Sequence, residues 1–183
     1  MRIAVVSEAG TRDKNGRIIQ ALKEVTGAQV LNLGMSETGD EPQLNCIHTG
    51  LIAALALYVG AADFVVGGCE TGQRFLISAM QYPGVFCGLI DNPHDAGLFS
   101  QINAGNCVSL PLNQAELPLR DIFGKLFCGK AQQSANRQAE HDALARLGKV
   151  TKRSIPEIVP ALDPAIISRV MNHRAFLALI GGA

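Results

Sequence analysis

Short apolar runs alternate with longer segments of helical length along most of the chain. Five runs rich in Val, Ile and Leu predict β-strands over residues 2–6, 29–33, 63–66, 85–90 and 106–110. The segments around them predict helices over residues 15–25, 42–58, 73–82, 93–104 and 113–127. Because continuous apolar strands need cover on both faces, we predict an α/β fold: a three-layer, doubly wound, Rossmann-like sandwich with a five-stranded parallel sheet.

The pattern changes after Gly129, where the composition turns to Ala, Gln, Arg and Asn and no further strand is predicted. Two helices are predicted here, over residues 134–147 and 164–180. We therefore divide the chain into an α/β domain, residues 1–130, and a C-terminal helical extension, residues 131–183. A single amphipathic helix is not stable alone, so the extension must pack on the chain's own core or on a partner subunit.

Composition and charge narrow the class of protein. The chain has 183 residues, a length that fits one globular domain. Of these residues 48% are hydrophobic and 17% charged, a composition that excludes general disorder. Sixteen Lys and Arg balance sixteen Asp and Glu, which gives no support for binding nucleic acid or an acidic membrane. From Lys130 onward eight basic residues outnumber four acidic ones, a local charge of +4 that could hold an anion.

The N-terminus and the cysteines predict a cytoplasmic protein. The first apolar run turns polar after four residues, so it lacks the apolar core of a signal peptide. The longest apolar run, residues 51–59, has about half the length of a membrane-spanning helix. Five cysteines, an odd number without a Cys-x-x-Cys pair, predict neither a disulfide framework nor a metal site.

The loop after the third predicted strand holds the strongest candidate chemistry. Residues 67–74 read Gly-Gly-Cys-Glu-Thr-Gly-Gln-Arg, between a buried strand and a helix. Ligands of such sheets bind at the carboxyl ends of the strands, and glycines there let backbone N–H groups converge on an anion. An exposed Cys69 would share that positive field as a thiolate base or nucleophile. A tight turn with a buried, inert cysteine explains the same residues equally well.

Three related motifs are absent from the sequence. Cys69 and Arg74 are separated by four residues, one fewer than a cysteine phosphatase loop needs. Residues 124–131 imitate a P-loop, but Ala131 replaces the Ser or Thr that would hold Mg²⁺. No Gly-x-Gly-x-x-Gly follows the first strand, so we predict no dinucleotide cofactor and no other cofactor.

A longer constellation resembles a known family. It consists of Cys69-Glu70-Thr71-Gly72, then Pro83-Gly84-Val85, then Asn103 and Asn106. In this register residues 60–110 resemble the ribose-5-phosphate isomerase B and galactose-6-phosphate isomerase family. The resemblance implies metal-independent aldose–ketose isomerisation of a phosphorylated sugar, in which one base carries a proton between C1 and C2 through an enediolate.

The resemblance also implies roles for individual residues. Cys69 would be the base and Thr71 a hydroxyl that contacts the substrate, while the backbone amides of residues 70–74 would form an anion hole. Glu8 would bind a sugar hydroxyl and Asn103 the enediolate oxygens. The full set of expected substrate-binding residues is Glu8, Gly68, Glu70, Gly72, Gln73, Arg74, His94, Asn103 and Arg137. Arg137 would contact the phosphate of a substrate that is bound in the site of a partner subunit, so we predict a homodimer or a dimer of dimers.

The sequence departs from the family pattern in its polar groups. Ile102 replaces the His that opens a sugar ring, which points to a short or already open substrate. Glu70 and Arg74 replace small residues, and Gln73 replaces an acidic base found in some members. His94 and His48 lie near the site in this alignment, but for each of them we favour an ordinary solvated or hydrogen-bonded loop histidine over a functional one.

Two further hypotheses come from other classes of protein. A catalytically silent member would bind a phosphorylated sugar or regulate a partner, as the crowded anion loop would allow. A thiol redox protein or phosphatase ranks well below both, because the sequence lacks a resolving cysteine and the correct phosphate loop.

Overall fold

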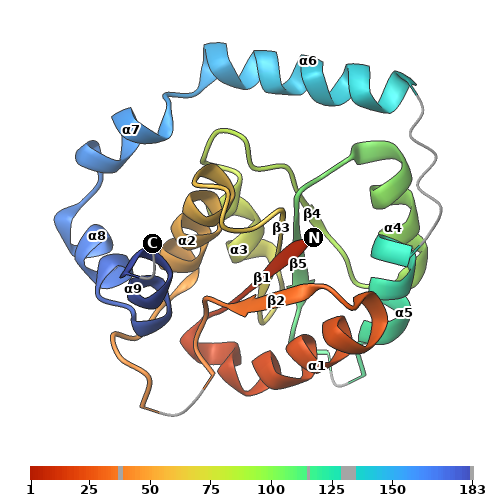
Figure 1. Ribbon diagram of the computed structural model, residues 1–183, viewed down its shortest axis with the longest axis horizontal. Coiled ribbons are helices and arrows are strands. Elements are labelled where there is room, and N and C mark those ends of the chain that lie inside the picture. Colours follow the sequence, from red (N-terminus) through yellow and green to blue (C-terminus); the bar gives the residue numbers. More distant parts are fainter. Residues whose placement is uncertain (37–38, 115, 129–134, 182–183) are drawn as a thin grey trace.

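Residues 1–36, 39–114, 116–128 and 135–181 are described by a computed structural model, which shows a three-layer α/β fold (Figure 1). Within these residues, a parallel sheet of five strands runs in the order β2-β1-β3-β5-β4. The strands are β1 (Arg2–Ser7), β2 (Gln29–Asn32), β3 (Phe64–Cys69), β4 (Cys87–Leu89) and β5 (Cys107–Pro111). The predicted fold class is confirmed, and each predicted strand overlaps an observed one.

Helices cover both faces of the sheet. On one face lie α1 (Asn15–Thr26), α4 (Pro93–Leu98) and α5 (Leu119–Phe123), and on the other lie α2 (Cys46–Tyr58) and α3 (Gln73–Ala79). Successive side chains of a strand point to opposite faces, so β1 gives Ala4 and Val6 to one core and Ile3 and Val5 to the other. All four are fully buried. Burial of each valine or isoleucine stabilises the fold by about 1.5–3 kcal/mol.

Among the described residues, four short helical turns complete the α/β part and its extension. They are η1 (Ala9–Lys14), η2 (Phe99–Asn103), η3 (Gly124–Cys128) and η4 (Val159–Ala161). Turn η2 continues α4, so the predicted helix over residues 93–104 is present as two joined elements.

Helix α2 begins four residues later than predicted, because Asn45 is its N-cap. The Asn45 side chain accepts hydrogen bonds from the N–H groups of Ile47 and His48, and His48 Nδ1 accepts one from the Asn45 N–H. The residues before this cap form a loop whose Leu44 carbonyl accepts a hydrogen bond from the N–H of Ala9. This bond joins the loop to the end of β1, where the candidate site lies.

Helix α5 also begins later than predicted, at Leu119 instead of residue 113. Pro118 precedes it, and a proline disfavours helical backbone at the residue before it. The stretch after β5 instead contacts the loop that follows β3. The N–H groups of Leu112 and Asn113 donate to the carbonyls of Cys69 and Glu70, each at 2.9 Å.

The single helix predicted over residues 164–180 is wrong, because the chain forms α8 (Pro164–Met171) and α9 (Arg174–Gly181). Val170 and Phe176 are both buried in the same core. Six residues at about 100° each would place them on different sides of one straight helix. The break at Asn172 and His173 lets both side chains reach that core.

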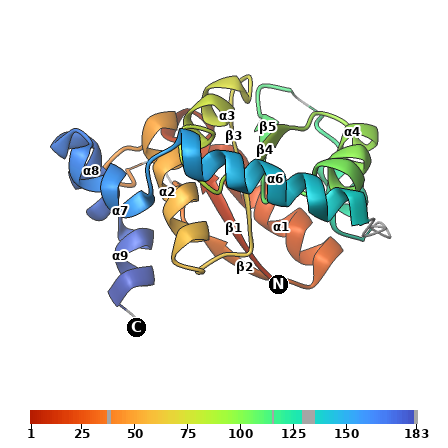
Figure 2. The same ribbon diagram turned by 90° about the horizontal axis from the view of Figure 1, so that it is seen from above.

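The C-terminal extension packs on the chain's own core along α2. It comprises α6 (Ala135–Thr151), α7 (Ile155–Ile158), η4, α8 and α9, and Figures 1 and 2 show α8 beside α2. Ile155, Val170 and Phe176 are buried together with side chains of α2 and α3. On α6, by contrast, Leu144 and Leu147 remain about half exposed. The division at residue 130 stays a prediction, because residues 129–134, including the predicted helix start at Ser134, lie outside the described residues.

None of the helices among the described residues is long and apolar enough to cross a membrane.

Candidate functional site

The strand order creates a crevice between the ends of β1 and β3. These strands are neighbours and pair in parallel from Ile3 with Phe64 to Ser7 with Gly68. After β1 the chain continues to α1 on one face, whereas after β3 it continues to α3 on the other face. The two loops therefore diverge at the carboxyl edge of the sheet. In open α/β sheets, this is where ligands bind.

A cleft of about 650 Å³ lies at this place. Its walls come from the end of β1, the loop before α2, the loop after β3, and α8 of the C-terminal extension. The lining residues are Glu8, Ala9, Gly10, Gln43, Leu44, Asn45, His48, Glu70, Arg74, Ala165, Ile166 and Arg169. The extension thus forms one wall of the cleft, and the predicted site residues Glu8, Glu70 and Arg74 face a common space.

Two cysteines and a glutamate form a contact network beside the cleft. Cys46, the first residue of α2, donates from Sγ to Oε2 of Glu8 at 3.0 Å, and it also contacts Cys69. Burial, and then the neighbouring Glu8 and Cys69, raise the pKa of Cys46 well above its ordinary value. Cys46 therefore stays a neutral thiol that holds the Glu8 carboxylate in place.

The expectation that Cys69 is exposed in a loop is wrong. Cys69 is the last residue of β3, and only 2% of its surface is exposed. Its carbonyl accepts hydrogen bonds from the N–H groups of Gly72 and Leu112, at 3.1 and 2.9 Å. The loop opens one residue later, at Glu70, so Cys69 lies directly behind the cleft wall.

The glycines around Cys69 serve packing and backbone turning. A Cβ on Gly67 would lie 2.3 Å from the Phe75 ring, and one on Gly68 would lie 2.4 Å from the Leu110 carbonyl oxygen. Gly72 has a φ of +76°, which a side chain would strain, at the point where the chain enters α3. Glycines at these three positions allow the strand end to lie against β5 and α3. Substrate binding by Gly68 and Gly72 stays a prediction.

His48 contributes a neutral donor to the cleft. Burial first, and then the nearby charge of Arg169, lower the pKa of this imidazole below its ordinary value of about 6.5. Nδ1 accepts a hydrogen bond from the Asn45 N–H at 3.0 Å. In neutral His48 the proton is therefore on Nε2, which makes no hydrogen bond with any described residue and can donate to a ligand.

The remaining predicted residues are not gathered in this cleft. Thr71 and Gln73 are exposed in the loop and at the start of α3, where the Thr71 hydroxyl accepts a hydrogen bond from the Gln73 N–H. His94 and Asn103 are exposed on α4 and η2, which lie at the other end of the molecule from α8 (Figures 1 and 2). Arg137 belongs to α6, and its side chain lies outside the described residues.

Sequence reasoning missed Cys46 and Arg169. Asn45 is a residue type that commonly caps helices, and this could have shown that Cys46 begins α2. A residue at that position lies in the first helical turn, beside the loop after β1. Arg169 is a polar residue within an apolar helix, and a single sequence gives no sign that this helix closes the cleft. The charge of +4 from Lys130 onward indicates an anion ligand in the extension, but it does not distinguish Arg169 from Arg137.

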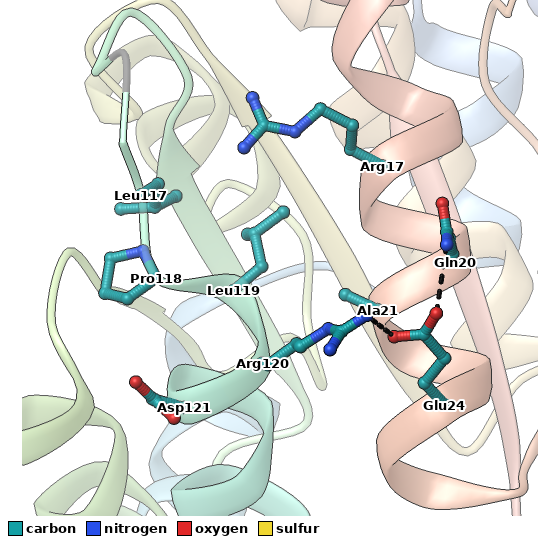
Figure 3. Close-up of a pocket in the computed structure, with 9 residues that line it drawn as sticks. All are labelled: Arg17, Gln20, Ala21, Glu24, Leu117, Pro118, Leu119, Arg120 and Asp121. Carbon is teal, nitrogen blue, oxygen red and sulfur yellow. Dashed lines mark hydrogen bonds and ion pairs between the residues drawn. The ribbon is translucent and has the colours of Figure 1, made fainter.

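A second pocket, of about 420 Å³, lies between α1 and the segment that begins α5 (Figure 3). There Glu24 forms an ion pair with Arg120 at 2.6 Å and accepts a hydrogen bond from Gln20 at 2.9 Å. Among the described residues that line it, none is Cys or His, and none belongs to the predicted site. Of the two acids that line it, Glu24 is paired with Arg120, and the pocket brings no cysteine or histidine to Asp121.

Within the described residues, no group of three or more His, Cys, Asp and Glu side chains could hold a metal ion. Whether the reaction is independent of metal stays a prediction. The chemistry that the cleft residues can supply is acid–base: two carboxylates, a neutral imidazole and two guanidinium groups line the cleft, and two buried thiols lie beside it.

The fold and cleft define an α/β protein with an acid–base site at the switch point of its sheet. Comparison with known proteins identifies the family within this class. The sequence model of the family described as Ribose/Galactose Isomerase matches residues 3–144. This chain belongs to that family. Among curated proteins, none matches the chain.

Solved structures agree with this assignment. A ribose-5-phosphate isomerase from Vibrio parahaemolyticus is 34% identical over all of this chain and 92% of its own, with a TM-score of 0.91. A 4-deoxy-L-threo-5-hexosulose-uronate ketol-isomerase, solved with a tartrate, is 32% identical over all of this chain and 92% of its own, also with a TM-score of 0.91. A ribose-5-phosphate isomerase from Thermotoga maritima, 19% identical over 79% of this chain and 97% of its own, shares the fold with a TM-score of 0.66.

Proposed function

We propose that this protein interconverts the aldose and ketose forms of a small, open-chain sugar phosphate through an enediolate. The observation that carries the proposal is the cleft itself: Glu8, held by the Cys46 thiol that also contacts Cys69, faces a space of about 650 Å³ at the switch point of the sheet. Membership of an isomerase family supports the reaction class.

In the proposed mechanism, Cys69 removes the proton from C2 of the aldose and returns it to C1, which leaves the ketose. The negative charge that develops on the oxygens is stabilised by the backbone N–H groups of Glu70 and Thr71, which donate to no described residue. His48 donates to a sugar oxygen from Nε2. Glu8 orients the chain of the sugar, accepts the proton of the C2 hydroxyl and passes it to the C1 oxygen, so that both the enzyme and the number of protons on the sugar are restored when the ketose forms.

The residue at position 102, Ile102, supports an open-chain substrate. The side chain of Ile102 is 53% exposed on η2 and cannot transfer a proton, so it cannot open a sugar ring. A substrate that already exists in linear form needs no such group. We therefore propose tetrose phosphates and other linear sugar phosphates before ring-forming pentose and hexose phosphates.

A second candidate substrate is a linear keto sugar acid that carries a carboxylate in place of the phosphate. The structure that is 32% identical over the whole chain is described as acting on such a compound, a hexosulose uronate. This candidate shares the reaction and the open chain with the first, and only the anionic group differs. One substrate screen can therefore separate the two.

The screen measures interconversion of four-, five- and six-carbon sugar phosphates and of linear hexosulose uronates. We expect turnover of at least one open-chain compound, with a Cys69→Ala variant as the matched inactive control. Turnover of uronates alone would move the substrate class to the second candidate. Binding of a sugar phosphate with no turnover of any compound would leave the catalytically silent member as the function.

We also propose that the working form is a homodimer or a dimer of dimers with a composite site. His94 and Asn103 are exposed far from the cleft of their own chain, so they can contribute only to the cleft of a second copy. The half-exposed Leu144 and Leu147 on α6 offer apolar surface for such a contact. Light scattering would test this, and an active monomer at micromolar concentration would contradict it.

A further inference from the structure

The wall that the C-terminal extension gives to the cleft carries a charge that the reaction scheme above does not use. Arg169, on α8 of the extension, lines the cleft together with residues from the ends of the strands and the loops that follow them. Its Nη1 donates to the Gln43 carbonyl at 3.1 Å, across 126 residues of sequence. This bond fixes one of the five N–H donors of the guanidinium and leaves the others available.

Opposite charges in the cleft are kept apart. Arg74 and Arg169 line it together with Glu8 and Glu70, yet no ion pair joins either arginine to a carboxylate of any described residue. Elsewhere in the protein, Arg2 and Arg120 each pair with an acid within 3 Å. A cleft with unpaired acids and unpaired arginines fits a ligand with hydroxyl groups at one end and an anion at the other.

The positive charge of Arg169 acts on another residue of the cleft. It is the charged group that, after burial, lowers the pKa of His48. His48 is only 8% exposed and has a free Nε2 donor, so it lies next to the space where an anion near Arg169 would sit. A guanidinium and a neutral imidazole donor together suit a carboxylate or phosphate oxygen.

We propose that Arg169, assisted by Arg74, binds the anionic group of the substrate within a single chain and so determines the preference for acidic sugars. This inference rests on the proposed function, since it names the group that holds the acidic end of that substrate. The ligand chemistry is an oxyanion, either a phosphate or a carboxylate. The role lies in the extension of the same chain, in addition to any contact that Arg137 makes across a dimer.

Calorimetric titration of the full chain with tartrate and with inorganic phosphate tests the proposal directly. We expect Arg169→Gln to weaken binding of at least one of these anions about ten- to hundredfold, the range expected for loss of a charge-assisted contact. Arg169→Lys should recover part of the affinity, because it keeps the charge and loses the forked geometry. The matched control is Arg146→Gln, which removes the same charge from an exposed position on α6 outside the cleft and should bind as the wild type does.

The two anions separate the two sources of the oxyanion. A loss confined to phosphate indicates a phosphorylated substrate, and a loss confined to tartrate indicates a sugar acid; both outcomes support the role of Arg169. Equal binding by wild type and Arg169→Gln overturns the proposal, as does the absence of binding of both anions to the wild type. Circular dichroism of each variant confirms that the exposed substitution leaves the fold intact.

Steady-state kinetics distinguish failure of this inference from failure of the proposed function. With an active substrate, Arg169→Gln should raise KM about ten- to hundredfold and change kcat little. Turnover with an unchanged KM overturns the inference and keeps the isomerase. Arg169-dependent anion binding without turnover of any sugar keeps the inference and removes the isomerase.

Discussion

At the scale of single residues, the chemistry of the site depends on which groups are kept neutral and which are kept charged. The Cys46 thiol is neutral because burial and Glu8 raise its pKa, and its proton is directed to the Glu8 carboxylate. His48 is neutral because burial and Arg169 lower its pKa. The cleft therefore offers a carboxylate acceptor and an imidazole donor near neutral pH, as enediol chemistry requires.

The first prediction concerns the proton-transfer base. Cys69→Ala removes the proposed base that would carry the proton between C1 and C2, so kcat should fall by at least about a hundredfold while KM changes little. Steady-state kinetics with the best substrate of the screen will measure both. Cys107→Ala, at a cysteine fully buried in β5, is the control and should keep kcat. Equal kcat in Cys69→Ala and wild type would transfer the role of base to another group.

The second prediction concerns cysteine reactivity, which access controls together with ionisation. Cys128 is exposed, whereas Cys46, Cys69 and Cys107 are at most 5% exposed. We expect a small alkylating reagent at pH 7 to label Cys128 first and Cys69 much later. Peptide mass mapping over time will show the order. Labelling of Cys69 at the rate of Cys128 would mean that the loop after β3 opens in solution.

The sequence predicted the chemistry of this site only in part. The loop from residue 67 to 74 could be found because its cysteine, glycines and arginine are adjacent along the chain. Arg169 could not be found in this way, because it is 126 residues from Gln43 in the sequence and only the tertiary packing of α8 brings the two together. The burial of Cys69 was missed because β3 extends three residues beyond its apolar run, through Gly67 and Gly68.

At the scale of elements, glycine and capping residues decide where strands and helices end. Strand β3 continues through Gly67 and Gly68 because both must lie against neighbours that leave no room for a Cβ. Asn45 starts α2, and Pro118 delays α5. Apolar periodicity predicted that each of these elements exists, but the caps and close contacts set their bounds.

The third prediction compares two glycines. Gly67→Ala should destabilise the protein by about 1–3 kcal/mol, because its Cβ would lie 2.3 Å from the Phe75 ring and the buried ring must shift. Gly148→Ala, in the interior of α6 with nothing within 4 Å of the added Cβ, should stabilise it by about 0.5–1 kcal/mol. Urea unfolding will measure both. A Gly67→Ala variant as stable as the wild type would show that β3 and α3 are less closely packed.

At the scale of the whole molecule, the C-terminal extension joins the fold to the site. Its helices bury Ile155, Val170 and Phe176 against the α2 side of the core, and α8 then presents Arg169 to the cleft. The sequence predicted that this segment must pack on a core, but left open whether on its own or on a partner's. The structure shows packing on its own core, so loss of that packing should affect both stability and ligand binding.

The fourth prediction concerns pH. His173, between α8 and α9, is 3% exposed, and its Nδ1 has no hydrogen-bond partner among the described residues. Burial lowers its pKa, assisted by Arg174 and opposed by Asp40. The unfolded chain then binds more protons than the folded one below the ordinary histidine pKa of about 6.5, so the free energy of unfolding should fall as pH drops through this range.

Urea titrations between pH 5 and pH 8 will test this, with His173→Gln as the comparison. The variant should lose part of the slope below pH 6.5, by at most about 1.4 kcal/mol per pH unit for one histidine. His48 contributes in the same direction, because its pKa is also lowered. Identical slopes for the variant and the wild type would show that His173 titrates alike in the folded and unfolded chains.

The central claim, that this protein moves a proton between adjacent carbons of an acidic sugar, is tested most directly by hydrogen exchange in deuterated water. Nuclear magnetic resonance can follow the C1 and C2 hydrogens of the best substrate or ligand in the presence of the protein. We predict that the wild type exchanges one of these hydrogens with solvent and that Cys69→Ala does so at least about a hundredfold more slowly. A wild-type protein that binds the compound and exchanges neither hydrogen would contradict the isomerase account and leave a binding protein.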